Sequence, residues 1–371
     1  MESVTVRKIF EKDKSYWDEN VQLFEHVHPF NAYDWGNVRA VDGWNAIYLV
    51  AERSGRFSGG LLLLVKKIPF LPWRIFYGPK GPICRPDDGE TIQAIHAKVL
   101  ELAKENNALF LRIDPSFMEE ESESFERIIS SLEYVHLEQR WTFWNSPRDV
   151  YRISLNENRS IDDLYNALDR DDKRCIRKAF KDGVIVEPAT TEDELRSFYD
   201  IFREFSVTKG FMARSYDYQR RLWESYVKRG RGRLFITRYE GNVIGGLICI
   251  LFGRKCLAMH MGAPYKYHKL QPYYAFVWES IRWANQMGCV WYSFRGVGTT
   301  PTQEAFKRKF NPKVVRLVGY YDFPFKPFLY KLFYWAEFTM LPASWPLIVK
   351  TRRFANQLMK GLSLSRQGHS E

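Results

Sequence analysis

Basic residues at short spacing are the chain's clearest candidates for chemistry, because Lys and Arg are the side chains that contact phosphate groups. One basic face lies in a segment expected to be helical, and another lies in a glycine-containing loop. The first comprises Lys173, Arg174, Arg177, Lys178 and Lys181, and the second is 228–233. Both could follow nucleic-acid phosphates with little sequence preference. A solvated surface with no ligand has the same composition, and that alternative stays open.

The histidines and cysteines are not arranged for nucleophilic or metal chemistry. His26 and His28 lie near the start and His260 and His268 lie far along the chain, without Cys or carboxylate partners at ligand spacing. We therefore expect no metal site. His260 is expected on a strand, in the core or lining a cleft. The five cysteines are scattered and form no CxxC pair, which predicts neither disulfides nor zinc.

Composition indicates a globular protein with a basic surface. The 371 residues suffice for two domains, with 45% hydrophobic, 27% charged and 16% aromatic residues. The net charge of +11 fits nucleic acid, pyrophosphate groups or anionic lipid as partner, and a merely basic protein is the alternative. The start lacks a signal-peptide pattern, and no apolar run of about eighteen residues occurs. We expect a soluble cytoplasmic protein, with peripheral membrane contact left open.

One pattern occurs twice and predicts the architecture. Two apolar strands around a turn carry a Gly-Gly pair, Gly59-Gly60 in the first copy and Gly245-Gly246 in the second. Each copy continues through a proline-containing turn into a helix and a further strand. The helices are expected at 91–105 and 275–286, and the strands at 108–113 and 290–294. The duplication predicts two similar α+β domains, and two such halves often build a site in the cleft between them.

The segments around the second copy define the expected boundaries. A break at Ser146-Pro147 separates the halves. We expect a first domain of residues 1–147, joined by the C-terminal segment 315–371, and a second domain of residues 148–314. Further expected elements are a strand at 151–155, a helix at 161–181 with Ser160 as N-cap and Gly183 as its end, a helix from Thr191 to about Ser206, a helix at 301–310 and a strand near 314–321.

The segment 323–360 is rich in aromatic residues and proline, with Lys and Arg between them. Aromatic residues interleaved with cations suit a membrane interface. An aromatic helix that packs back on the first domain has the same pattern. The sequence leaves both interpretations open.

Several motifs follow one another in a characteristic order. They are Tyr33-Asp34-Trp35 with Arg39, Tyr77-Gly78-Pro79, Arg112-Ile113-Asp114-Pro115, the basic helix 172–179, Lys209-Gly210-Phe211 with Arg214 and Tyr218, Tyr292–Val297, and Phe306-Lys307-Arg308-Lys309-Phe310. In this order, and with the duplication, the chain resembles the Fem family of peptidyltransferases (FemX, FemA and FemB). Each copy resembles the GNAT acyltransferase fold.

The resemblance implies a fold class: α+β, with two tandem GNAT-like acyltransferase domains, a cleft between them and no long coiled-coil arm. The short helices between 161 and 206 place the chain with the armless, FemX-like branch. Ser293 stands where the family usually has an acid. Neither copy has a convincing coenzyme A pyrophosphate loop, since Arg295-Gly296-Val297-Gly298 has the wrong spacing. No cofactor is expected.

The resemblance also implies a reaction and a site. An amino acid is transferred from aminoacyl-tRNA to the stem-peptide amine of a peptidoglycan precursor, lipid II or UDP-MurNAc-pentapeptide. Lys307 takes the position of the cation that stabilises the oxyanion, and Asp114 matches an acid that orients the amine or relays its proton. The resemblance also places Phe306 beside Lys307, and Arg39 (where the family has a Lys), Arg214 and Tyr218 at the precursor. Tyr77 and His260 are further candidates for the lining of the same cleft and for precursor contacts. The basic face with Lys173, Arg174, Arg177 and Lys178 is the candidate contact for the tRNA that this reaction requires.

Two other function classes remain open. One is an N-acyltransferase of the GNAT superfamily that uses acetyl coenzyme A, against which the missing loop counts. The other is a non-catalytic RNA- or membrane-binding protein. For the leading hypothesis we expect a monomer in the cytoplasm, with peripheral contact between its basic aromatic C-terminal segment and the anionic inner face of the membrane.

Overall fold

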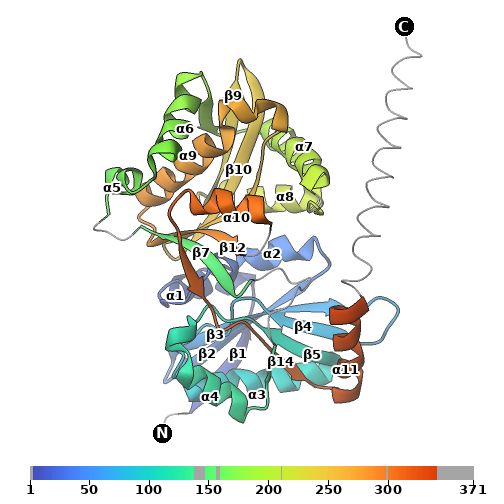
Figure 1. Cartoon of the computed structure of the whole chain (residues 1–371). Coiled ribbons are helices and arrows are strands. Elements are labelled where there is room, and N and C mark those ends of the chain that lie inside the picture. The colour runs from blue at the N-terminus through green and yellow to red at the C-terminus, as the bar shows by residue number, and fades with distance from the viewer. Residues whose placement is uncertain (1–2, 138–146, 156–158, 210, 298–299, 341–371) are drawn as a thin grey trace, which may run out of the picture.

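The computed structural model describes residues 3–137, 147–155, 159–209, 211–297 and 300–340. Figure 1 shows two mixed sheets, one above the other, each covered by helices. We call the first sheet with its helices the first half and the second sheet with its helices the second half. Among the described residues the longest helix is α7, with 18 residues. The expected α+β fold, with two similar units and no long helical arm in the described part, is confirmed.

The first sheet has seven strands, in the order β1-β2-β3-β4-β5-β14-β6. Neighbours are antiparallel except β4 and β5, which are parallel and connected through α3. The bounds are β1 (Val4–Ile9), β2 (Asn45–Arg53), β3 (Arg56–Lys67), β4 (Arg74–Gly78), β5 (Ala108–Ile113), β14 (Tyr320–Pro324) and β6 (Val135–Leu137).

The second sheet also has seven strands, in the order β13-β7-β12-β11-β10-β9-β8. Again one pair is parallel, β11 with β12, and it is connected through α9. The bounds are β13 (Lys313–Arg316), β7 (Asp149–Ser154), β12 (Trp291–Gly296), β11 (Lys255–Gly262), β10 (Asn242–Phe252), β9 (Gly232–Tyr239) and β8 (Ile185–Pro188).

The helices cover both sheets. In the second half α6 and α9 lie on one side of the sheet and α7 and α8 on the other (Figure 1). The α-helices are α1 (Lys14–Val21), α2 (Asp34–Ala40), α3 (Gly89–Glu105), α4 (Glu123–Ser131), α5 (Ile161–Asn166), α6 (Arg170–Lys181), α7 (Glu192–Lys209), α8 (Tyr216–Leu222), α9 (Pro272–Gln286), α10 (Pro301–Arg308) and α11 (Pro327–Trp335). The 3-10 turns are η1 (Glu11–Asp13), η2 (Pro29–Asn31), η3 (Glu119–Glu121) and η5 (Tyr265–Leu270), and the π-turns are η4 (Trp223–Val227) and η6 (Ala336–Met340). None of the described helices has the length and apolar character needed to cross a membrane.

The Gly-Gly pairs serve the same purpose in the two copies. A Cβ on Gly60 in β3 would lie 2.8 Å from the ring of Trp17, and a Cβ on Gly246 in β10 would lie 2.9 Å from the ring of Phe198. In both sheets the missing side chain lets a buried aromatic ring pack directly on the strand backbone. The duplication is therefore visible in the packing as well as in the order of elements.

The expected helix at 161–181 is wrong in one respect, because the segment forms two helices, α5 and α6. Ser160 caps α5 as expected, accepting the Asp163 N–H. Asp169 then takes extended backbone angles (φ −62°, ψ 154°) and begins α6 as its N-cap residue. Asp favours that position, and the break leaves Leu168 buried in the core of the second half. Gly183 follows the end of α6 with φ +89°, as expected.

The expected strand near 314–321 is also wrong, since the segment contributes to both sheets. β13 pairs with β7 in the second sheet, and β14 pairs with β5 and β6 in the first. Between the two strands Gly319 has φ +87°, a conformation that favours glycine. The chain thus returns here from the second half to the first.

The described part of the C-terminal segment packs on the first half. Arg112 of β5 donates to both carboxylate oxygens of Asp322 in β14 at 2.7 Å and to Glu337 at 2.8 Å, and all three side chains are buried. Tyr330 of α11 donates to Asp322 at 2.9 Å. This charged network attaches residues 320–337 to the first sheet. Residues 341–371 lie outside the described part.

Candidate active site

A wide cleft lies between the two halves and has a volume of about 2180 Å³. Pockets for drug-sized ligands have roughly 300–1,000 Å³, so this cleft is suited to larger substrates. The structure brings together seven of the residues named from the sequence. The lining includes Arg39, Tyr77, Arg214, Tyr218, His260, Phe306 and Lys307.

Lys307 lies near the end of α10. In Figure 1 this helix lies on the side of the second half that faces the first half. The helix begins with Thr300 as N-cap, whose hydroxyl accepts the Gln303 N–H, and with Pro301 at its first position. Lys307 Nζ donates to the Gly296 carbonyl at 2.7 Å. Burial and the nearby positive charge of Arg295 lower the pKa of Lys307 to about 8. The hydrogen bond therefore holds the ammonium in place. Because its pKa is about 8, the ammonium begins to lose its proton at a pH only slightly above neutral.

Two phenylalanines hold the Lys307 turn against the second half. Phe310 is buried, and Phe306 packs against the same core with its ring centroid 5.5 Å from that of Tyr274. The two Phe ring centroids are 5.4 Å apart. Phe306 and Phe310, four residues apart, therefore anchor this turn to the core of the second half.

Arg295 is a cleft residue that we did not select from the sequence. It is the penultimate residue of β12 and has φ +65°, in the left-handed region that is unusual for residues other than glycine. Its surroundings lower its pKa, mainly through burial of the guanidinium. The available signal was its place in the motif Tyr292–Val297, but its conformation is decided by tertiary contacts.

Ser293 holds the Arg295 backbone in place, and its hydrogen bonds explain why a serine stands where the family usually has an acid. Its hydroxyl donates to the Tyr151 carbonyl at 3.0 Å and accepts the Arg295 N–H at 3.1 Å. A carboxylate could accept the second hydrogen bond but not donate the first. Ser293 is buried, so its role is to position the backbone of Arg295.

Asp42 joins two cations that come from different halves. Its carboxylate lies 3.6 Å from Arg39 Nε and 3.0 Å from Arg214 Nη1. Aromatic rings support both guanidinium groups, with Arg39 5.5 Å from the Trp44 centroid and Arg214 5.4 Å from that of Tyr218. The result is a pair of oriented Arg side chains at the wall of the cleft, and Asp42 was not foreseen from the sequence.

His260 and two tyrosines complete this part of the lining. His260 Nδ1 shares a hydrogen bond of 3.0 Å with the Gln219 amide. Burial, followed by the charges of Arg295 and Arg214, lowers its pKa to about 3, so its ring is neutral at physiological pH. Burial also raises the pKa values of Tyr218 and Tyr77, which therefore keep their protons. These groups can orient a polar substrate without adding charge.

Asp114 is not among the cleft-lining residues. It is buried at the end of β5, where it forms an ion pair of 2.9 Å with Lys80 Nζ and accepts the Lys80 backbone N–H at 2.9 Å. Its charge contributes, after burial, to the raised pKa of Tyr77. The observed contacts make Asp114 part of the support behind Tyr77.

The basic face of α6 lies outside the cleft. Arg174, Arg177 and Lys178 are exposed, and Lys173 is partly exposed with its Nζ donating to the Asn166 carbonyl at 3.1 Å. Arg174 pairs with Asp171 and Lys178 with Asp182, both on the surface. Such exposed pairs are weak and leave the cations accessible to a phosphate.

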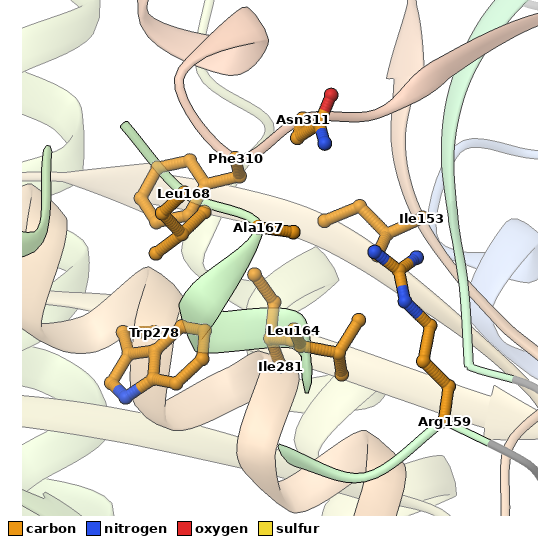
Figure 2. Close-up of a pocket in the computed structure, with 9 residues that line it drawn as sticks. All are labelled: Ile153, Arg159, Leu164, Ala167, Leu168, Trp278, Ile281, Phe310 and Asn311. Atoms are coloured by element: carbon orange, nitrogen blue, oxygen red, sulfur yellow. The ribbon is translucent and has the colours of Figure 1, made fainter. Parts of the chain in front are cut away.

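The described residues give no sign of metal or disulfide chemistry. No group of three or more potential metal ligands occurs among them, and the five cysteines are free thiols. A second hollow, shown in Figure 2, lies under α5 between Leu164, Trp278 and Phe310. Its volume of about 10 Å³ is at most enough for one water molecule. The wide cleft is therefore the candidate site.

Comparisons with known proteins agree with this geometry. Residues 17–231 match the FemAB family, and residues 168–308 match the acetyltransferase (GNAT) domain. The chain is 24% identical to the lipid II:glycine glycyltransferase of Staphylococcus aureus (strain MRSA252) over 209 residues. This aligned segment covers 56% of this chain and 49% of the relative. The chain thus spans about half the length of the curated relatives it matches.

Two solved structures share the fold. The crystal structure of FemX superposes with a TM-score of 0.81 at 18% sequence identity, covering 88% of this chain and 99% of FemX. A tandem GNAT protein from the clavulanic acid biosynthesis pathway superposes with a TM-score of 0.51 at 11% identity, covering 87% of this chain and 98% of that protein. Two tandem GNAT-like units are therefore an established arrangement for a chain of this architecture.

Proposed function

Since the chain belongs to the FemAB family, we propose that it transfers an amino acid from aminoacyl-tRNA to the stem-peptide amine of a peptidoglycan precursor. The observation that carries this proposal is that Lys307, Arg295, Arg214 and Arg39 all line one cleft. Its volume suits a precursor and the end of a tRNA together. The similarity to lipid II:glycine glycyltransferase supports the same substrate class.

The proposed reaction is aminolysis of an ester. The acceptor amine forms a C–N bond with the ester carbonyl carbon, and the C–O bond to the tRNA ribose breaks. The amine loses a proton and the ribose hydroxyl gains one, so the transfer needs no oxidant or cofactor. The activated ester leaves the enzyme two tasks, to position both substrates and to stabilise the developing oxyanion.

We propose Lys307 as the catalytic residue that stabilises the developing oxyanion. Its Nζ is fixed by the Gly296 carbonyl and still has donors left for a substrate oxygen. Phe306 and Phe310 keep the turn from moving, which preserves the geometry on which electrostatic stabilisation depends. Asp114 is proposed as a positioning residue that acts through Lys80 and Tyr77.

We assign the phosphate and peptide of the acceptor to the cleft wall formed by Arg39, Arg214 and Tyr218. Arg side chains bind phosphate oxygens in a bidentate manner, and here the rings of Trp44 and Tyr218 support the two guanidinium groups. Tyr77 and neutral His260 supply uncharged hydrogen-bonding groups nearby. The tRNA backbone is assigned to the exposed cations of α6, namely Lys173, Arg174, Arg177 and Lys178.

We further propose the domain limits 1–147 with 315–371, and 148–314. The pairing of β14 with β5 supports the return of the chain to the first half. We also propose a monomer that works in the cytoplasm at the inner face of the membrane, whether its acceptor is lipid II or UDP-MurNAc-pentapeptide.

The decisive experiment offers radiolabelled amino acids on a total tRNA pool to the protein, with lipid-linked and nucleotide-linked muramyl pentapeptide supplied separately. Label on either acceptor, abolished by ribonuclease, is the expected result and identifies both substrates. An N-acyltransferase that uses acetyl coenzyme A is the second candidate, favoured by the match to the acetyltransferase (GNAT) domain. Consumption of acetyl coenzyme A with an amine panel, and no transfer from tRNA, would establish that candidate instead.

A further inference from the structure

Two segments far apart in the sequence share one apolar cluster at the edge of the first half. Ile68 and Trp73, at the ends of the β3–β4 loop, pack in the same cluster as Leu329 and Phe333 of α11. Figure 1 shows this loop beside α11. The cluster fixes the loop and the helix relative to each other.

The outer side of this cluster exposes large apolar side chains. Phe70 is fully exposed at the loop tip, and Phe328 of α11 is 81% exposed. Phe328, Leu332 and Trp335 are spaced by four and three residues, which places them on one face of the helix. We define the apolar platform as Phe70, Leu71, Phe328, Leu332 and Trp335, all of which are exposed.

The loop backbone directs Phe70 outward. Phe70 has φ +63°, a conformation that costs a bulky residue about 1–3 kcal/mol. Hydrogen bonds from the Ile68 N–H to the Trp73 carbonyl (3.0 Å) and from the Leu71 N–H to the Ile68 carbonyl (3.2 Å) close the loop around it. A tight loop that exposes a Phe in a strained conformation indicates a contact made outside the chain.

The charged residues of the two segments that form the apolar platform have one sign. Lys67 and Arg74 flank the loop, and Lys326 and Lys331 lie on or next to α11. The segments 66–74 and 326–336 contain no Asp or Glu. Apolar and aromatic side chains on segments whose charged residues are all cations match the interface of an anionic bilayer, where each nearby Lys or Arg adds about 1 kcal/mol of attraction.

We propose that the apolar platform docks the protein on an anionic membrane, with Phe70 and Leu71 inserted at the headgroup level beside the apolar face of α11. The docking proposal itself depends only on the geometry and charges of these two segments. The functional benefit of docking rests on the proposed function. A protein bound to the membrane is already located where a lipid-linked acceptor is embedded. This surface joins the C-terminal segment to a loop that lies some distance away in the sequence.

The test uses the full chain and vesicles of phosphatidylcholine with or without phosphatidylglycerol, in a sedimentation assay. We expect the wild type to bind the anionic vesicles. The paired substitutions Phe70→Ser with Leu71→Ser, and Lys67→Glu with Lys331→Glu, should each weaken binding by about tenfold. The matched controls Leu23→Ser and Lys104→Glu alter exposed side chains elsewhere and should bind as the wild type does.

Equal binding by the wild type and the Phe70→Ser/Leu71→Ser variant would overturn the proposal, as would no binding by the wild type. A wild-type dimer that this variant turns into a monomer would assign the surface to a second copy instead. Transfer to the nucleotide-linked acceptor, measured in solution, distinguishes a failure of the docking proposal from a failure of the proposed function. If docking alone is wrong, that transfer persists; if the proposed function alone is wrong, vesicle binding persists without transfer.

Discussion

Arg214 Nη1 donates to Asp42 Oδ2 at 3.0 Å, and the two residues come from opposite halves of the molecule. The same carboxylate lies 3.6 Å from Arg39. In the free protein Asp42 therefore holds two cations, one from each half, at the wall of the cleft. A phosphate that binds there adds charge-assisted hydrogen bonds to guanidinium groups that are already oriented.

Removing Arg214 should weaken acceptor binding. In the variant Arg214→Ala we expect the KM for the precursor to rise about tenfold or more, since hydrogen bonds to charged groups contribute about 1.5–3 kcal/mol. kcat should change less. Arg220→Ala, which removes an exposed cation on the neighbouring helix α8, is the matched control. An unchanged KM in Arg214→Ala would remove this residue from the acceptor site.

Lys307→Ala should lower kcat roughly 100- to 1,000-fold, because a fixed donor to the oxyanion is lost. Precursor binding, measured by titration calorimetry, should be largely retained. Lys313→Ala removes a nearby exposed Lys outside the cleft lining and should be neutral. Turnover at the wild-type rate in Lys307→Ala would reject Lys307 as the catalytic cation.

The pH profile should report the charge of Lys307. Its pKa is lowered to about 8, so the ammonium is mostly present below pH 8 and is lost as pH rises through that value. We therefore expect kcat to decline above about pH 8. Lys307→Arg keeps a positive charge throughout this range and should lack the alkaline decline, even if its overall rate is lower. The same alkaline limb in wild type and Lys307→Arg would assign it to another group.

The basic face of α6 should act through tRNA alone. The double variant Lys173→Glu/Arg177→Glu should raise the KM for aminoacyl-tRNA. It should also reduce the salt dependence of tRNA binding. The slope of log K against log salt concentration should become shallower by roughly 0.7–0.9 for each phosphate that is no longer neutralised. The KM for the precursor should not change. Lys98→Glu/Lys104→Glu, on α3, is the charge-matched control. Equal effects of both double variants would indicate only a general loss of positive charge.

The buried network around Arg112 should control stability. Asp322→Ala leaves Arg112 with part of its charge uncompensated in the interior, which should lower the free energy of unfolding by about 3–5 kcal/mol in denaturant titrations. Asp171→Ala removes a carboxylate from an exposed pair and should cost under about 1 kcal/mol. A small effect of Asp322→Ala would show that the C-terminal segment is held mainly by apolar packing.

The sequence by itself determined the duplicated architecture and most of the cleft. Hydrophobic periodicity, the Gly-Gly pairs and the capping residues are local signals, so α3, α9 and the strands around them appear where they were expected. The ordered motifs also selected Arg39, Tyr77, Arg214, Tyr218, Phe306 and Lys307, which the fold brings into one cleft. His260, expected from the sequence in the core or lining a cleft, lies in the same cleft.

Tertiary structure alone decided the features that depend on contacts between distant residues. The segment 313–324 is divided between two sheets because strand partners, and not local propensity, choose the register. Asp42 reaches Arg214 across 172 sequence positions, and Asp114 is turned toward Lys80 behind the cleft. The lowered pKa of Lys307 likewise arises from burial and from Arg295, two conditions that exist only when α10 and β12 are packed together.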